Sequence, residues 1–409
     1  MLHYDTREQH FTISGTVKHE RSARANISLR DLSLYFLKLG AFGFGGPIAL
    51  AGYMQRDLHE DRHWISHEEF QDGLAIAQTM PGPLAAQLAM WIGFIRHGVL
   101  GATLVGVLFV LPPFLLVVAI AAVYVAFAGL PQIRALFYGI GPAAIAIIVL
   151  AAWKLAKSTD GKDPKLWGVS AVLLLITVVT QSELAWLFII AGLLGVLVYA
   201  SPWKHRSKPP TGAPPTGLLA LPLGYGLPLV VSTLGVGTLV ALTLFFLKAA
   251  AFTFGSGLAI VPFLHQGVVV DHHWLTERQF LDAVALGIIT PGPVVIMAAF
   301  VGYLAAGLLG ASLAAFGVFA PVWLFAVVIG RLFLRYRHHP EVRGFVKGAT
   351  AAAVGAIAGA AVILGHGAII DAVTAGIFLA ALLVLYFKKL KEPYVIGLAG
   401  IVGLILFHG

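Results

Sequence analysis

The sequence predicts an all-α polytopic membrane protein built from two homologous halves of about six spans each, inverted relative to one another. Of its 409 residues, 59% are hydrophobic and only 11% are charged. Soluble proteins carry about 25% charged residues, so most of this surface must face lipid. Apolar stretches of about 20 residues, each long enough to cross a bilayer as a helix, recur along the chain.

An internal repeat supports the prediction of two halves. Residues 36–83 align without a gap to residues 246–293, and 17 of the 48 positions are identical. The identities include Lys38 with Lys248, Trp64 with Trp274 and Asp72 with Asp282. Chance similarity between apolar segments would not keep Lys, Trp and Asp in register, so the second half is a duplicate of the first.

Four segments follow from the repeat and from composition. Residues 1–30 are polar and form a predicted cytoplasmic tail, residues 31–200 and 217–409 are the two transmembrane repeats, and residues 201–216 are a basic, Pro-rich cytoplasmic linker. No apolar core of a cleavable signal peptide occurs in the tail. A chain of this kind is typical of a bacterial inner membrane. It contains no cysteine, which excludes disulfides and thiolate metal sites.

The positions of the basic loops predict the inversion. Lys and Arg concentrate in cytoplasmic loops, and in the first repeat they follow the fourth span, near residues 134–156. In the second repeat they cluster at 331–343 and 388–391 instead. The two patterns agree if residues 217–237 form an additional span. We therefore expect 12 to 13 spans, a cytoplasmic N-terminus and a periplasmic C-terminus.

The second span of each repeat is predicted to break inside the membrane. It begins with a capping box, at Ser66 and at Thr276, and after about fourteen residues reaches Pro-Gly-Pro, at 81–83 and 291–293. Proline removes an N–H donor and disfavours helical geometry at the residue before it, but it suits the first turn of a new helix. The alternative is that these prolines only kink the spans.

The first span has a similar expected break, at Gly43–Pro47, with Thr253–Gly257 as its counterpart. Ser256 is positioned to cap a second half-helix. Broken helices at matching places in inverted halves indicate a transport site, and four helix N-termini would favour an anion. The alternative is that the glycines only allow close helix packing.

Two duplicated charged pairs are further candidates. Lys38 and Lys248 lie within spans, where a lysine either serves function or extends its amine to a nearby interface. Asp72 and Asp282 lie early in the second spans; they are candidate proton-coupling groups, or they complement a helix dipole. Asp271-His272-His273 resembles part of a metal site, but Asp61-Arg62-His63 replaces it in the first repeat, so we expect no metal.

At these motifs the chain resembles the chromate ion transporter family in its long, two-domain form. The resemblance rests on Phe42–Pro47, on Gln78–Pro83 and on the later pattern of Gly93, Gly98, Gly101 and Pro112-Pro113. It implies efflux of chromate, with sulfate as a related oxyanion. We expect no cofactor. The substrate-binding residues expected from these motifs are Lys38, Gly45, Gly46, Pro47, Gln78, Pro81, Gly82, Pro83, Lys248, Gly255, Ser256, Thr290, Pro291, Gly292 and Pro293.

Other functions remain open at this point. A transporter of sulfate or of another small anion fits the same residues. An enzyme is not expected, because the sequence contains no His-Glu-x-x-His, Gly-x-Ser-x-Gly or P-loop motif. A non-transporting interaction protein would not need broken helices. Nucleic acid is not an expected partner, since the net charge of +8 lies in loops between apolar segments.

Overall fold

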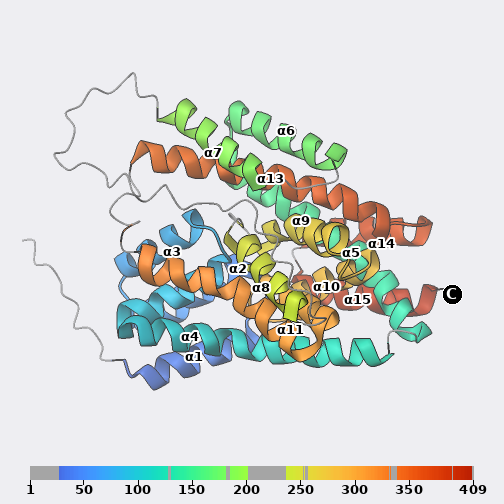
Figure 1. Cartoon of the computed structure of the whole chain (residues 1–409), viewed down its shortest axis with the longest axis horizontal. Coiled ribbons are helices and arrows are strands. Elements are labelled where there is room, and N and C mark those ends of the chain that lie inside the picture. Colours follow the sequence, from blue (N-terminus) through green and yellow to red (C-terminus); the bar gives the residue numbers. More distant parts are fainter. Residues whose placement is uncertain are drawn as a thin grey trace, which may run out of the picture.

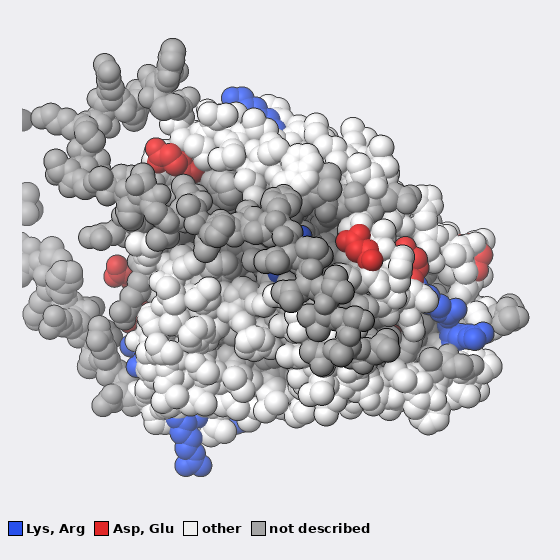
Figure 2. Space-filling model, in the orientation of Figure 1, with Lys and Arg blue, Asp and Glu red and all other residues white. Residues whose placement is uncertain are grey.

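Every element among the described residues is helical, as the sequence predicts. A computed structural model describes residues 27–127, 130–180, 185–200, 236–251, 253, 257–330, 332, 339–388 and 390–407 (Figure 1). Within them, four helices are long and apolar enough to cross a membrane, at residues 84–127, 131–159, 294–329 and 340–368. Figure 2 shows that neither basic nor acidic residues cover most of the visible described surface, which suits contact with lipid.

The two repeats contain the same series of elements. The first comprises α1 (Leu29–Phe42), α2 (Gly46–Met54), η1 (Gln55–Asp61), α3 (His67–Thr79), α4 (Leu84–Phe127), α5 (Pro131–Thr159), α6 (Pro164–Thr180) and α7 (Ala185–Tyr199). The second comprises α8 (Val236–Ala251), η2 (Gly257–Ala259), α9 (Ile260–His265), η3 (Gln266–Asp271), α10 (Glu277–Ile289), η4 (Val294–Ile296), α11 (Met297–Leu324), η5 (Phe325–Ile329), α13 (Pro340–Ala368), α14 (Ala372–Leu383), η6 (Val384–Lys388) and α15 (Glu392–Leu406).

The ends of α3 and α10 follow from local sequence. Both helices begin with the predicted capping box, in which the Ser66 or Thr276 side chain accepts from the third helical N–H and the third side chain accepts in return. They end at Thr79 and Ile289, and the C-cap residues that follow, Met80 and Thr290, have extended backbones directly before Pro-Gly-Pro. The proline ring excludes the helical conformation at that residue.

The chain reverses at Pro-Gly-Pro, where the sequence suggested an interrupted span that continues across the membrane. Gly73 of α3 packs against Trp91 of α4, and Arg96 forms an ion pair with Glu69. A residue further before residues 81–83 thus contacts a residue further after them, which is the pattern of two antiparallel helices joined by a turn. We call α3 with residues 84–96 of α4 the second hairpin. Its arms of about 20 Å are too short to cross a bilayer core of about 30 Å.

The first predicted span is also a hairpin. The Tyr35 hydroxyl of α1 donates to the carboxylate of Asp57 (3.2 Å), beyond the end of α2. We call α1 and α2 the first hairpin; α8 and α9 are its counterpart, since Phe245 of α8 stacks edge-on against Trp274. At the break between α1 and α2, Gly45 and Gly46 have φ of 109° and 74°, which glycine adopts without the strain that other residues would meet.

A second sharp turn divides α4. His97 and Gly98 have non-helical angles, with φ of 61° at Gly98, and Gly93 packs directly against Gly101. Ala306 and Gly307 repeat this turn in α11, where φ at Gly307 is 64°. Residues 99–127 then form one helix of about 43 Å, long enough to cross the bilayer.

The duplicated histidines shape a turn. His63 and His273 have φ of 51° and 52°, an uncommon backbone conformation for a residue with a side chain. In each, Nδ1 lies within 2.8 Å of the carbonyl oxygen four residues earlier. The ring of His272 stacks on Trp274, with centroids 4.3 Å apart. These contacts give the histidines a structural role in the turns that precede α3 and α10.

The repeats are inverted, because equivalent helices run in opposite directions. Helices α5 and α13 are counterparts, and Gly141 of α5 packs against Ala368 while Ile145 packs against Gly365. Residue numbers increase along α5 while those of the contacting residues decrease along α13, so the two helices are antiparallel. The α5–α6 loop region carries four lysines, whereas residues 366–371, between α13 and α14, contain Asp371 and neither Lys nor Arg. The predicted additional span at 217–237 falls almost wholly outside the described residues.

The hairpin geometry predicts the sidedness of labelling. The natural chain has no cysteine, so single-cysteine variants report one position each. We expect His67→Cys and Val99→Cys to react with a membrane-impermeant maleimide from the same side of the membrane. His67 begins the second hairpin and Val99 comes just after it, so both lie at its open end. Gln132→Cys, after the crossing helix, should react from the other side. Labelling of His67→Cys and Val99→Cys from opposite sides would contradict the hairpin and show that this segment crosses the membrane.

Candidate functional site

Backbone hydrogen bonds connect the helix breaks of one repeat to those of the other. The N–H of Gly82 donates to the carbonyl of Thr253 (2.6 Å), and the N–H of Gly292 donates to the carbonyl of Gly43 (2.9 Å). Gly43 and Thr253 are equivalent positions, as are Gly82 and Gly292. The same hydrogen bond is thus made twice, so each Pro-Gly-Pro turn joins the first hairpin of the opposite repeat.

Both central glycines need their missing side chain. Gly82 has φ of 126° and Gly292 of 84°, in the region that favours glycine. A Cβ on Gly292 would lie 2.9 Å from Cγ of Pro113, and one on Gly82 would lie 2.9 Å from Nε2 of Gln87. Conformation and close packing therefore both require glycine at these two turns.

The breaks bring helix ends of both signs together. Helices α2 and α4 begin at Gly46 and Leu84, directly after their breaks, as the motifs predict. Because the chain reverses, α1 and α3 also end there, and a helix C-terminus carries a partial negative charge that offsets an N-terminus. The sequence argument counted only the positive ends. The summed helix dipoles at the breaks therefore partly cancel.

Gln87 is a polar residue at this site that the sequence argument missed. It lies one turn into α4 after Pro83, is fully buried, and donates from Nε2 to the carbonyl of Pro81 (2.5 Å). Its Oε1 is buried with no hydrogen-bond partner among the described residues. A glutamine within the apolar sequence of residues 84–95 was the available signal. The second repeat has the apolar Ile296 and Met297 at the corresponding place.

The other candidates differ in exposure. Pro83, Thr290 and Pro291–Pro293 are buried, Gly45, Gly46, Pro47 and Pro81 are half-buried, and Gln78 is exposed. Lys38 and Lys248 are exposed on α1 and α8, about one turn before the breaks. Their side chains are therefore not buried where the Pro-Gly-Pro turns contact the opposite repeat. Gly255 and Ser256 lie outside the described residues.

The duplicated aspartates occupy unequal surroundings. Asp282 is 4% exposed and accepts a hydrogen bond from the hydroxyl of Tyr124 (2.7 Å), a residue of α4 in the opposite repeat. Asp72 is half-buried. The ring of Tyr124 packs edge-on against Phe137 and Phe300, which fixes its position. Asp282 therefore lies in a cross-repeat contact and does not merely complement a helix dipole at a surface.

Comparison with known proteins identifies close relatives. A family model described as chromate transporter matches residues 30–196 and 240–404. The chain is 49% identical to the chromate transport protein of Cupriavidus metallidurans, over 93% of this chain and 94% of that one. It is 48% identical to a probable chromate transport protein of Synechococcus elongatus, over 93% and 96%. The chromate transport protein of Pseudomonas aeruginosa is 31% identical, over 93% of each chain. No solved structure matches.

Substitution of a turn glycine should weaken the junction. We expect Gly292→Ala to lower stability by about 1–2 kcal/mol, because alanine disfavours positive φ and its Cβ would press on Pro113. Gly52→Ala, in the middle of α2 with open space around its Cβ, should leave stability unchanged or raise it slightly. Melting temperatures of the purified proteins measure both effects, and equal melting temperatures would contradict the close junction.

Proposed function

The chain belongs to the chromate transporter family, and on that premise we propose that it exports chromate from the cytoplasm and confers chromate resistance. The support is the match of the family model to both repeats together with two relatives at 48–49% identity along nearly their whole length. The alternative substrate is sulfate or another small anion, since tetrahedral oxyanions of equal charge present the same acceptors to N–H donors.

We further propose that the substrate binds where the Pro-Gly-Pro turns meet the first hairpins. A dianion leaving water must exchange its hydration for other donors, because an unpaired charge in a low dielectric costs many kcal/mol. Non-helical backbone at membrane depth is tolerated where it lines a cavity or is buried in protein. Backbone N–H groups in the first turns of α2 and α4 are the available donors, with Lys38 and Lys248 as candidate cations at the approach.

Gln87 adds a specific contact to this proposed site. An acceptor that is buried without a partner costs about 1–3 kcal/mol, so Oε1 gains from any donor that reaches it. An oxyanion carrying one proton, or a water molecule that accompanies the anion, offers such a donor. Because only the first repeat has this glutamine, we propose that the two pseudo-equivalent turns do not bind substrate equally.

We place the N-terminus in the cytoplasm, the C-terminus in the periplasm and the protein in a bacterial inner membrane. The four lysines near the α5–α6 loop and their absence from the equivalent residues 366–371 support this orientation. In this arrangement each repeat presents its hairpins toward a different side of the membrane. Such an arrangement suits a carrier whose central site is reached alternately from either side.

Chromate uptake into everted membrane vesicles tests the proposed function. Export in cells becomes uptake in such vesicles, and sulfate should compete with it. Gln87→Glu should reduce initial uptake at least tenfold, because a carboxylate would repel the anion at short range. Gln71→Glu, on the exposed side of α3, is the matched control and should retain uptake. Vesicles that contain the natural protein and accumulate sulfate but no chromate would establish the alternative substrate.

A second experiment tests whether Asp282 couples transport to protons. Asp282→Asn keeps the shape and the hydrogen bond with Tyr124 but removes the exchangeable carboxyl proton. We expect it to abolish the response of chromate uptake to an imposed pH gradient. Asp72→Asn should reduce that response less, because Asp72 is more exposed. An unchanged response in Asp282→Asn, at equal protein abundance, would assign Asp282 a purely structural role.

A further inference from the structure

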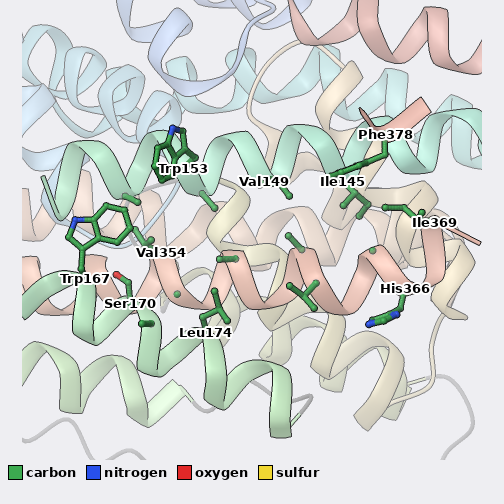
Figure 3. A pocket seen from close by; sticks show the side chains of 18 residues that line it. Ile145, Val149, Trp153, Trp167, Ser170, Leu174, Val354, His366, Ile369 and Phe378 are labelled. Atoms are coloured by element: carbon green, nitrogen blue, oxygen red, sulfur yellow. The ribbon is translucent and has the colours of Figure 1, made fainter. Parts of the chain in front are cut away.

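An apolar groove lies between helices of the two repeats, and none of the candidate site residues lines it. It has a volume of about 710 Å³ and is bounded by α5, α6, α13 and α14 (Figure 3). Its walls include Val149 and Leu174, and its open side faces out of the protein. Within a membrane such a groove must hold apolar matter, because water there would be costly.

Small side chains create the groove. Helix α13 contributes Gly355, Ala358 and Ala361 to its floor, and α6 contributes Ser170 and Ala171 to its wall. The same glycine permits α6 to approach α13 closely, since a Cβ on Gly355 would collide with the carbonyl oxygen of Ser170. The floor of the groove is therefore formed by closely packed helices with small side chains.

One end of the groove is aromatic and basic. Trp153 and Trp167 lie there with ring centroids 6.2 Å apart, and both are partly exposed (Figure 3). The ammonium of Lys157 lies 5.2 Å from the Trp153 ring centroid. Three more exposed lysines lie in the same region: Lys154 precedes Lys157 in the sequence, and Lys162 and Lys165 follow it. Tryptophan and lysine together are typical of a helix end at the headgroup level of a bilayer.

Two carboxylates at this end do not neutralise the lysines. Asp160 is buried and bonded to the Ser170 hydroxyl (2.7 Å), and burial raises the pKa of its carboxyl. The Tyr199 hydroxyl donates to Asp163 and holds the pKa of that carboxyl below its usual range, so Asp163 stays charged and engaged. Four lysines against at most two carboxylates leave this end positive.

The other end of the groove has the opposite character. Ile369 lines it, and Asp371 follows two residues later. The backbone N–H of Thr374 and the hydroxyl of Tyr138 hold the pKa of Asp371 below its usual range, so it is negatively charged. The sequence has no Lys or Arg between Lys347 and Lys388. The anionic end of a ligand is thus attracted to the lysine end of the groove.

We propose that the groove binds an acyl chain of an anionic phospholipid whose phosphate lies against Lys157 and the neighbouring lysines. Basic pockets between transmembrane helices are a recognised form of anionic headgroup site, and the tryptophans add indole contacts at the same depth. A second copy of the chain fits the groove less well. A two-fold axis along the membrane normal would bring the two lysine clusters to the same depth and close to each other.

Quenching by brominated lipids tests the proposal on the purified full-length protein. Bromine on an acyl chain quenches a tryptophan that it touches, and Trp153 and Trp167 lie in the groove. In phosphatidylcholine vesicles, we expect dibromo-phosphatidylglycerol to quench this component at about tenfold lower content than dibromo-phosphatidylcholine. The double variant Trp153→Phe and Trp167→Phe identifies the component by removing it.

Matched variants separate the headgroup from the groove. Replacement of Lys154, Lys157, Lys162 and Lys165 by Gln should abolish the tenfold preference, whereas replacement of all four by Arg should keep it together with the membrane orientation. Ala171→Phe fills the groove and should reduce quenching by both lipids. Val172→Phe, on the adjacent exposed face of α6 outside the groove, should not.

Three results would overturn the proposal. The first is equal quenching by the two brominated lipids, and the second is a preference that survives in the four-glutamine variant. The third is a disulfide-linked dimer of Ala171→Cys in native membranes, which would show that a second copy covers the groove. The absence of other cysteines makes that cross-link unambiguous.

Discussion

The two reciprocal hydrogen bonds between the repeats are the constraint on which the rest of this architecture depends. Helix breaks within the membrane leave backbone groups that lipid cannot satisfy. The Gly82 N–H and the Gly292 N–H each find a carbonyl in the opposite repeat, at Thr253 and Gly43. Neither repeat can satisfy its own break in this way. Docking of the two halves therefore satisfies backbone groups that lipid would leave unpaired.

Inversion explains how one duplicated sequence meets this requirement. A two-fold relation turns a single contact between a Pro-Gly-Pro turn and a first hairpin into two. The same relation places α5 against α13 in opposite directions and leaves space for the apolar groove beside their contact. Glycine and alanine dominate these contacts because backbones approach closely there, as expected where helices associate in lipid by packing.

The departures from symmetry are more informative about function than the symmetry itself. Gln87 has no polar counterpart in the second repeat, and Asp282 is buried where Asp72 is half-buried. Tyr124, which donates to Asp282, belongs to the first repeat. The Tyr124–Asp282 hydrogen bond, like the two bonds from Gly82 and Gly292, thus joins the two halves. A transport cycle that moves one repeat against the other would alter these contacts directly.

The sequence by itself determined the helical class, the duplication, the capping boxes at Ser66 and Thr276 and the breaks at Pro-Gly-Pro, because each depends on local chemistry or on direct comparison of residues. It also indicated the inversion through the distribution of lysine and arginine. Only the tertiary structure decided that the chain reverses at the breaks, since Pro-Gly-Pro allows both a kink and a turn. The contacts of Gln87 and Asp282 were equally beyond reach, because burial beside a distant residue is a property of packing and leaves no periodic signal in the chain.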